Sequence, residues 1–513
     1  MGVPWYKLGM FIRKKPNKSG TISVQIIKKV SRSNRIVKTI GCGTTAEELE
    51  ALERRARTEL EMLRPQLSFS FDMSDREMSV VELVKTCRVY AVGPELILGK
   101  IFDHLGFSFI PDELFKDIVL ARLVYPTSKL RTTEYLRQHT GKNVQVARIY
   151  RFLDRLGCQY KEEVERLSFN YTKRVLGDVV VAFYDMTSLY FEAEREDDLR
   201  RIGFSKDGKF QHPQIMLGLL VGIDGYPISY DIYEGNTFEG DTLIPALKKV
   251  QDRFGLTRPT VIADSALLSR KNLNALDEEG YQYIIGARIK NEDSETKAKI
   301  LQLGARLNNR ECTVFKRKDG KRLILNFSET RAKKDAANRE KGITRLKRNI
   351  SSGKLTKGSI NSRGYNKFLA LEGDVTITLD EKRIEEDKAW DGLKGYITNS
   401  RMTPEEVVSN YRQLWKIERA FRISKTDLRI RPIYHRKRNR IEAHICVSFV
   451  AYTIFKEFER QLAQKQSALS PQRALDIMKT IYQVELYMPD SKKYHRQFTQ
   501  LTPEQTMLLA LDP

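Results

Sequence analysis

The sequence predicts an α/β protein built around a mixed sheet that helices flank. Three observations lead to this class. Residues 178–290 alternate short β-branched apolar runs with amphipathic helical patterns. The pair Asp224-Gly225 stands between two such runs, which is a strong signal for a β-hairpin. The chain has 513 residues, 41% of them hydrophobic, so it can form roughly two to four domains with cores of their own.

The elements of this region follow one another in a recognisable order. A first strand, "DVVVAFYD", ends at Asp185, and "HPQIMLGLLVGIDGYPISYDIYEGN" forms the hairpin. A helix, a strand, a second helix and a last strand follow in "EGDTLIPALKKVQDRFG", "PTVIADSALLS", "RKNLNALDEEG" and "YQYIIGARI". This is the order of a ribonuclease-H-like core, and we assign residues 177–290 to its first part.

Two regions of different character precede the core. Residues 1–91 begin with short extended runs between basic turns, which predict a small antiparallel sheet, and continue into a helix that Thr45 can cap. Residues 92–176 show short, basic helical patterns separated by turns. Such helices fit a helix-turn-helix that binds DNA, and they also fit a plain helical bundle. We expect residues 92–176 to form a helical DNA-binding domain.

The remaining regions interrupt and then complete the core. Residues 291–395 hold predicted strands and a very basic helix, "ETRAKKDAANREKGITRLKRNI", and are interpreted as a β-rich insertion. The core resumes over 396–460, where "TPEEVVSNYRQLWKIERAFRISKTDL" has the pattern of one helix. Residues 461–513 are expected to form a helical C-terminal region.

The amino-acid composition indicates what kind of molecule the protein binds. Lys and Arg outnumber Asp and Glu by 89 to 66, and the net charge of +23 is spread along the chain, which favours a polyanion as partner. The five cysteines form no CxxC pair, which is typical of a reducing compartment. No apolar stretch is long enough for a membrane span, and the first residues lack the apolar segment of a secretory signal. We expect a cytoplasmic protein without a membrane partner.

Two acids stand where predicted strands emerge from the core. Asp185 follows the first strand and Asp264 follows "TVIA", and the hairpin and helix between them would return the second strand beside the first. Adjacent carboxylates repel each other unless a cation lies between them, and Mg²⁺ suits one or two carboxylates that share it with substrate phosphates. Either aspartate alone is more typical of a turn or a cap. The pair indicates a two-metal site for phosphoryl displacement.

Glu418 is the candidate for a third acid. Tyr411, Glu418 and Lys425 recur every seven residues and therefore share one face of the predicted helix. Several cations of the same segment are candidates for holding DNA phosphates: Arg412, Arg419, Arg422 and Lys425. The alternative is an exposed helix on which Glu418 pairs with Arg422 one turn later.

Two histidines follow this helix. His435, in "IRPIYHRKRNR", lies among cations and is a candidate DNA contact. His444, in "EAHICVSF", is more typical of a core or helix-face residue whose hydrogen bonds are satisfied.

Taken together, these motifs resemble a known family. The chain is similar to DDE transposases of the IS4 superfamily of bacterial insertion sequences, and in particular to their IS1634-like group. The segments that carry the resemblance are "FYDMTSLYFE", "YEGNTFEGDTLIP", "VIADSALLS", "GARIK", "RAKKDAANREK", "DGLKGYITN", "YRQLWKIERAFRISKTDLRIRPIYH" and "RIEAHI". Each segment alone is weak, but the set is specific.

The resemblance implies a mechanism and a set of site residues. It makes Asp185, Asp264 and Glu418 the catalytic triad that binds two divalent metals, Mg²⁺ with Mn²⁺ as a substitute. It implies cut-and-paste transposition on double-stranded DNA, with terminal inverted repeats and target DNA as substrates, a homodimer in the DNA complex and no use of ATP. A family signature places Tyr, Arg, Glu and Lys at fixed spacing; Tyr411, Glu418 and Lys425 fit it, and Leu414 stands where the family has Arg.

Two other functions remain open at this point. One is a DNA-binding protein derived from a transposase that no longer cuts. The other is a metal-dependent DNA nuclease that never joins strands, because nicking and joining use the same metal site. For the transposase we expect a cytoplasmic location, with the protein on the nucleoid when it is bound to DNA.

Overall fold

The structure is a computed structural model in which the chain clusters into two compact units. The first unit comprises Met1–Cys87 and Leu486–Lys493, and the second comprises Arg88–Glu485 and Tyr494–Pro513. The described residues are 10–30, 33–62, 84, 87–177, 179–205, 207–255, 258–265, 269–355, 357–361, 364–372, 376–488 and 493–511. Parts of the predicted region 1–91, namely residues 1–9 and 63–83, lie outside this set.

The first unit contains the small antiparallel sheet and the helix that the sequence predicts. Its elements are β1 (Met10–Pro16), β2 (Ile22–Val30), β3 (Ser33–Gly43) and α1 (Ala46–Met62). The strand order is β1-β2-β3, and α1 packs against the sheet. Val24 and Ile26 of the central strand are buried, as is Ala56 of the helix. The Glu48 amide donates to the Thr45 hydroxyl at 3.3 Å, so Thr45 caps α1 as expected.

The centre of the second unit is a mixed eight-stranded sheet with the order β10-β11-β14-β9-β8-β5-β6-β7. Its strands are β5 (Val181–Tyr190), β6 (Gln214–Val221), β7 (Pro227–Glu234), β8 (Thr260–Ala263), β9 (Tyr283–Ala287), β10 (Cys312–Lys316), β11 (Arg322–Phe327) and β14 (Leu393–Thr398). The β6–β7 hairpin turns at Asp224-Gly225, where φ is 62° and 78°. Strands β5, β8 and β9 are parallel, and their order along the chain confirms the predicted sequence of strand, hairpin, helix, strand, helix and strand.

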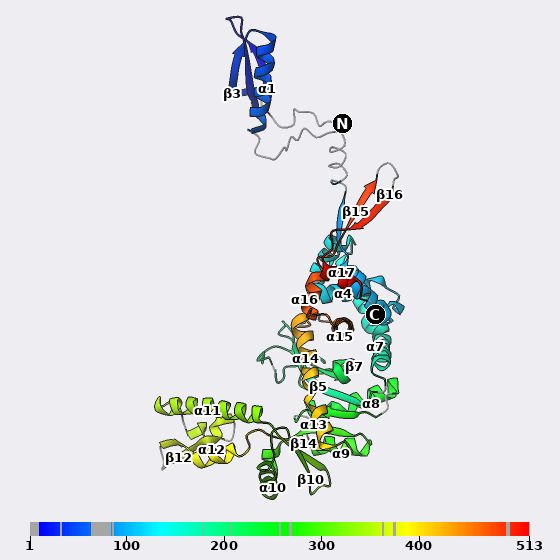
Figure 1. The fold of residues 1–513 in the computed structure, drawn as a ribbon, viewed down its shortest axis with the longest axis vertical. Coiled ribbons are helices and arrows are strands. Elements are labelled where there is room, and N and C mark those ends of the chain that lie inside the picture. Colours follow the sequence, from blue (N-terminus) through cyan, green and yellow to red (C-terminus); the bar gives the residue numbers. More distant parts are fainter. Residues whose placement is uncertain are drawn as a thin grey trace. The chain divides into compact units, whose positions relative to one another are not determined.

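Helices cover both faces of this sheet (Figure 1), and its central strands are therefore buried on both sides. One face packs against α8 (Leu243–Phe254), α9 (Arg270–Glu278) and α10 (Ser294–Gly304). The other packs against α13 (Pro404–Arg412), α14 (Trp415–Arg422) and α15 (Arg438–Gln464). Alternation along β5 shows the two faces directly, since Phe183 belongs to the α14–α15 side and Tyr184 to the α8–α9 side.

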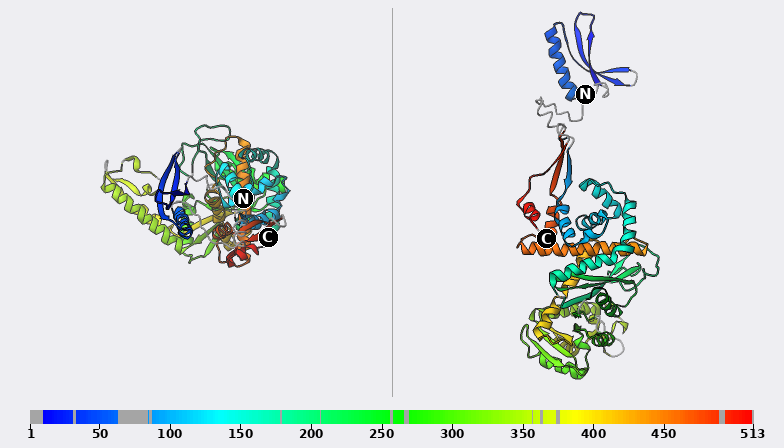
Figure 2. Two further views of the ribbon diagram at one scale, coloured as in Figure 1. Left: turned by 90° about the horizontal axis from the view of Figure 1, so that it is seen from above. Right: turned by 90° about the vertical axis from the view of Figure 1, so that its right-hand side faces the viewer.

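The helices of the predicted DNA-binding region share a core with α15. They are α3 (Lys100–His104), α4 (Glu113–Val124), α5 (Lys129–Tyr135), α6 (Val146–Arg155) and α7 (Lys161–Leu176). In the right-hand view of Figure 2, α15 runs as a long orange helix between these cyan helices and the green sheet. Almost the whole of α15 is buried, which is why its sequence is apolar on all sides over residues 443–455.

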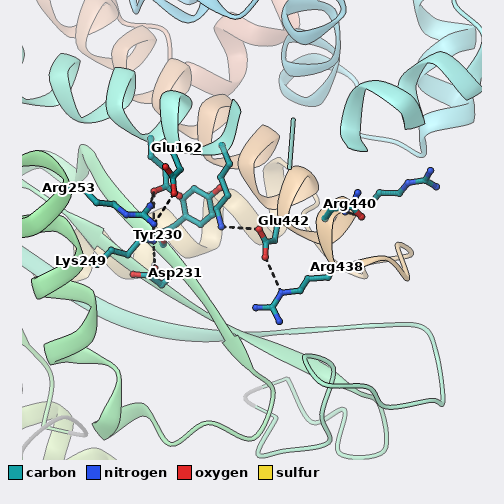
Figure 3. A network of polar contacts seen from close by, with 11 residues as sticks. Glu162, Tyr230, Asp231, Lys249, Arg253, Arg438, Arg440 and Glu442 are labelled. Carbon is teal, nitrogen blue, oxygen red and sulfur yellow. Dashed lines mark hydrogen bonds and ion pairs between the residues drawn. The ribbon is translucent and has the colours of Figure 1, made fainter. Parts of the chain in front are cut away.

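Ion pairs join α7 and α15 to the sheet (Figure 3). Arg253 of α8 contacts Glu162 of α7 at 3.1 Å, and Lys249 of the same helix pairs with Asp231 of β7. Lys161 of α7 donates to Glu442 of α15 at 3.2 Å. These contacts link α7 to α8 on one side and to α15 on the other, and α8 is in turn paired with β7 of the sheet.

Residues 291–395 divide between the central sheet and a separate small module. Strands β10 and β11 hydrogen-bond to β14 and extend the sheet, although the sequence analysis places them in the insertion. The module consists of α11 (Glu329–Ser351), β12 (Leu369–Glu372), β13 (Thr376–Leu379) and α12 (Glu381–Lys388). Its own apolar core is built on Leu346, Phe368, Leu369 and Ile384. The division of the chain into six regions stays a prediction.

The prediction of a helical C-terminal region over 461–513 is wrong in part. Helices α16 (Pro471–Met478) and α17 (Pro503–Leu509) are present, but β15 (Tyr482–Met488) and β16 (Lys493–Phe498) lie between them. These strands pair with β4 (Arg88–Ala91) in the order β16-β15-β4. Residues almost 400 positions away in the sequence supply the hydrogen bonds of β15, so no local pattern reveals this sheet.

Two further expectations concern the whole chain. All five cysteines are free thiols. Among the described residues, no helix combines the length and the apolar character that crossing a membrane requires.

Candidate active site

Asp185 and Asp264 lie where the parallel pairing of two neighbouring strands ends. The register of β5 and β8 aligns Phe183 with Ile262. Asp185 lies two residues further along β5, and Asp264 directly follows the last residue of β8. Side chains alternate along a strand, so the Asp185 carboxylate belongs to the face on which Phe183 is buried. Adjacent strands are about 4.8 Å apart, so the backbones that carry the two predicted acids run close together.

The prediction that the first strand ends at Asp185 is wrong. Strand β5 continues to Tyr190, because β6 pairs with it over its whole length and satisfies its backbone groups. Asp185 instead marks the place where the parallel pairing with β8 stops, since the last aligned pair is Phe183 and Ile262. The Asp185 carboxylate accepts a hydrogen bond of 2.7 Å from the Met186 amide, and its side chain is half-buried. Asp264 directly follows β8, as expected.

Glu418 comes from the opposite layer, on α14. The predicted single helix over 403–428 is in fact three helical segments, α13, α14 and the π-helical η11 (Ile423–Asp427). At the first junction the amides of Gln413 and Leu414 donate three residues back, to Asn410 and Tyr411, which tightens the turn. Helix α14 packs on β5 through Ile417 and Phe421. Glu418 is exposed.

Tyr411 is close enough to two of the predicted acids for their charges to act on it. Its side chain is buried, and burial together with the carboxylate of Asp264 raises the pKa of the Tyr411 hydroxyl, to which Glu418 also contributes. Gly286 of β9 makes room for this hydroxyl, because a Cβ atom at residue 286 would lie 2.4 Å from Tyr411 Oη and 3.5 Å from the Ser265 amide nitrogen. The hydroxyl therefore sits next to the residue that follows Asp264.

Lys394 is a cation of this site that the sequence analysis did not identify. Its Nζ lies 4.6 Å from the centre of the Tyr411 ring, within the range of a cation–π contact. Burial and the positive charge of Arg331 lower the pKa of Lys394, while the charge of Glu418 opposes them. The motif "DGLKGYITN" contains this lysine, but the motif alone does not show that β14 runs beside Tyr411.

The predicted DNA-binding cations divide into two groups. Arg412 and Arg422 are exposed. Arg419 pairs with Glu459 of α15, and the Lys425 ammonium lies 3.6 Å from the Asp207 carboxylate. Arg419 and Lys425 therefore already have internal ion-pair partners.

Leu414, at the position where the resemblance expects Arg, is buried in the core that α14 shares with the sheet. An arginine here would carry an uncompensated charge into that core. A positive charge that contacts the Tyr411 ring comes from Lys394 of β14 instead.

The donor set fits a divalent metal only in part. Among the described residues, no group of three or more His, Cys, Asp or Glu side chains is close enough together to hold an ion. The pair of Asp185 and Asp264 does match Mg²⁺, which is commonly held by one or two carboxylates together with water and substrate phosphates. The charges of both Asp264 and Glu418 raise the pKa of Tyr411, but Glu418 does not form a three-ligand group with the two aspartates within the described part of the chain.

Comparison with known proteins identifies the family. The family described as Transposase DDE domain matches residues 180–454, which is more than half of the chain. The match covers β5, β8 and α14, the three elements that carry the acids. The chain belongs to this family and is a DNA transposase, an enzyme whose relatives use divalent metal ions.

Similarities to solved structures are more distant. A synaptic complex of the piggyBac transposase with hairpin DNA is 9% identical, with 75% of this chain and 76% of that chain covered and a TM-score of 0.37. A paired-end complex of the Mos1 transposase with the left transposon end is 14% identical. The match covers 47% of this chain and 67% of the Mos1 chain, with a TM-score of 0.16. No curated protein matches the chain.

Proposed function

We propose that this transposase cuts the ends of an insertion sequence and joins them to target DNA, with Asp185, Asp264 and Glu418 as ligands of catalytic Mg²⁺ that Mn²⁺ can replace. The observation that supports the proposal is the register of β5 and β8, whose last aligned pair precedes each aspartate by two residues. The ribonuclease-H-like identity of the core and membership of the IS4 superfamily, in its IS1634-like group, belong to the same proposal. The order of strands supports the ribonuclease-H-like core, and the sequence motifs support the IS4 group.

In this proposal some site residues bind the metal ions and others bind the DNA. When bound, the metal ions supply the positive charge that activates the attacking oxygen and stabilises the leaving oxygen in an in-line displacement. Asp185 and Asp264 hold these ions from the rigid sheet, and Glu418 approaches from α14. Tyr411 and Lys394 contact each other, and the charge of Glu418 acts on both of them. Arg412 and Arg422, both exposed, bind phosphates of the strand that is cut.

The substrates are double-stranded terminal inverted repeats and target DNA. Two ends must meet one target, so the active species is a homodimer on DNA. The helices of residues 92–176 contact the duplex, and the protein works in the cytoplasm, on the nucleoid when bound. The net charge of +23 supports a polyanionic substrate of this kind.

The first test is cleavage of a labelled duplex that carries the element's own ends. We expect the wild-type protein to nick this duplex in Mg²⁺ and not in EDTA, and Asp185→Asn to lose at least about 10³-fold in rate because a metal ligand is gone. Asp252→Asn is the matched control: it makes the same change in charge at an exposed residue of α8, which covers the opposite face of the sheet, and it should cut normally. Equal cutting by both variants would remove Asp185 from the site.

A second substrate separates joining from nicking. Precut ends with free 3′-hydroxyls should be joined to a target plasmid by the wild type and by Asp252→Asn. Cleavage without joined product would identify a nuclease, and binding without cleavage in either metal would identify a DNA-binding protein that has lost catalysis.

A further inference from the structure

A cationic cavity lies between α4, α5 and the start of α15, apart from the acids. Its volume is about 330 Å³. Six of its lining residues carry basic or imidazole side chains: Arg122, Lys129, Arg429, Arg431, His435 and His444. No carboxylate is among the described residues that line it. The mouth includes Ser128, Arg429 and Tyr434, which are exposed, so the cavity opens to solvent.

Two of these cations are buried without a counter-ion. Arg122 and Lys129 are each only 6% exposed. The Arg122 guanidinium donates to the Leu428 carbonyl at 3.3 Å, but within the described part of the chain neither side chain forms an ion pair with a carboxylate. Burial, and then the positive charge of Arg122, lower the pKa of Lys129. A buried cation without a partner is costly, which indicates that an anion completes the site.

The acids nearest to this cavity are already engaged. Asp154 accepts two hydrogen bonds of 2.7 Å from the Arg440 guanidinium. Asp207 forms ion pairs with Arg431 and Lys425. Neither carboxylate is therefore available to neutralise Arg122 or Lys129.

His444, which also lines the cavity, has a buried nitrogen without a hydrogen-bond partner among the described residues. Its Nε2 lies 2.8 Å from the Ile430 carbonyl, and since a carbonyl only accepts, Nε2 carries the proton. Its Nδ1 is buried and has no hydrogen-bond partner among the described residues. The ring is buried as the sequence predicts, but its hydrogen bonds are not all satisfied. His435 stacks at a tilt against it, with ring centres 5.3 Å apart.

We propose that this cavity binds a phosphate group through Arg122 and Lys129, and that in the DNA complex the group is a backbone phosphodiester. Arginine and lysine are the usual phosphate ligands, and the exposed Tyr434 at the mouth can stack on a base. The assignment to DNA, though not the phosphate chemistry, rests on the proposed function.

The position of the cavity supports a DNA source. Ile433, next to the lining residue Pro432, donates through its amide to the Tyr190 carbonyl at 3.1 Å. Tyr190 ends β5, the strand that carries Asp185. The five steps along the strand from Asp185 to Tyr190 span about 17 Å at roughly 3.3 Å each. A DNA strand that advances about 3.4 Å per nucleotide would cover that length in about five nucleotides.

The phosphate chemistry is tested on the full-length protein without DNA. Inorganic phosphate, compared with chloride at equal ionic strength, should raise the Tm of the wild type by several degrees. Lys129→Met should lose this shift and should melt higher than the wild type in chloride, because an unpaired buried charge is gone. Arg131→Met, an exposed cation two residues further on the same helix, should keep the shift. Lys129→Gln repeats the test if the Met variant does not fold. Equal shifts in the wild type and both Lys129 variants would overturn the proposal.

Duplex binding then separates the two sources of phosphate. If the ligand is a DNA phosphate, Lys129→Met should bind duplex about 10-fold more weakly than Arg131→Met, and its slope of log K against log salt should be smaller by about one. If Lys129→Met loses the phosphate shift but binds duplex as the control does, the ligand is free phosphate and the DNA assignment is overturned. Neither measurement requires cleavage. Their results therefore do not depend on whether Asp185 has the proposed catalytic role.

Discussion

At the scale of single residues, the candidate site depends on one close contact across two layers. The hydroxyl of Tyr411, on α13, reaches the backbone of β9 because residue 286 is glycine. Lys394 lies over the other part of the same ring. Tyr411 is therefore in contact with both β9 and β14.

Gly286→Ala should disturb this contact. The new Cβ would lie 2.4 Å from Tyr411 Oη, so the ring must move. We expect a loss of about 1–3 kcal/mol in the free energy of unfolding, as for other overpacked cores, together with slower cleavage. Urea unfolding and the cleavage assay measure the two effects.

Tyr411→Phe provides the control for that variant. It removes the oxygen atom that collides with the added Cβ, so Gly286→Ala should cost less in the Tyr411→Phe background than in the wild type. Additive costs in this double-mutant cycle would show that the two residues do not interact.

At the scale of elements, buried carboxyl groups and basic side chains form ion pairs where α7, α8 and β7 meet. Glu165 of α7 is fully buried, and its Oε2 accepts from Arg253 of α8 at 3.3 Å. Its other oxygen, Oε1, has no hydrogen-bond partner in the described part of the chain. Burial raises the pKa of Glu165, and it raises the pKa of Asp231 in the same network. This junction therefore connects the helical region to the sheet with carboxyl groups that the fold favours in their protonated form.

The sign of the resulting pH dependence follows from the raised pKa. Between the ordinary value of 4.5 for Glu165 and its higher value in the fold, the folded protein binds more protons than the unfolded chain. Stability should therefore fall as the pH rises through this window. Glu165→Gln removes the titration and should flatten that part of the profile, measured as the free energy of unfolding between pH 4.5 and 7.5.

Glu163→Gln is the matched control on the same helix. The Arg166 guanidinium holds the pKa of Glu163 below its ordinary value, so its contribution has the opposite sign and is lost as the pH falls. A Glu163→Gln profile that keeps the wild-type decline above pH 4.5, beside a flattened Glu165→Gln profile, is the expected result. Identical profiles for the wild type and Glu165→Gln would contradict it.

At the scale of the whole molecule, the excess of positive charge determines how binding responds to salt. The net charge is +23. Each phosphate that a protein neutralises releases counterions from DNA, so affinity falls as salt increases. The exposed arginines of α13 and α14, and the basic cavity, are two places in the second unit where such contacts can form.

We expect the affinity for duplex DNA to fall by about 10³–10⁵ between 50 and 200 mM KCl, the range for roughly six to ten phosphate contacts. Fluorescence anisotropy with a labelled duplex measures this slope. Unrelated duplex of the same length should give a similar slope with weaker binding, because phosphate contacts carry no sequence information. An affinity that does not change with salt would exclude phosphate contacts as the main source of binding.

Several features of the fold could be predicted because their causes are local. Apolar runs, the Asp224-Gly225 turn and the amphipathic helices determine the order of elements from β5 to β9. The β15–β16 hairpin could not be predicted, because its partner β4 is distant in the sequence. The break between α13 and α14 was missed as well, since Gln413 and Leu414 carry no Gly or Pro to mark it.

The class of the protein, the family it resembles and the candidate aspartates can be inferred from the sequence, because strand patterns, the acids that flank them and the motifs are all local. Which groups meet depends on the tertiary structure. The parallel pairing of β5 with β8 ends just before Asp185 and Asp264, and Lys394 reaches Tyr411 from another strand. The cavity joins Arg122 and Lys129 to His444, more than 300 residues later in the chain, and the physical reason is that packing, not sequence distance, determines which charges are buried together.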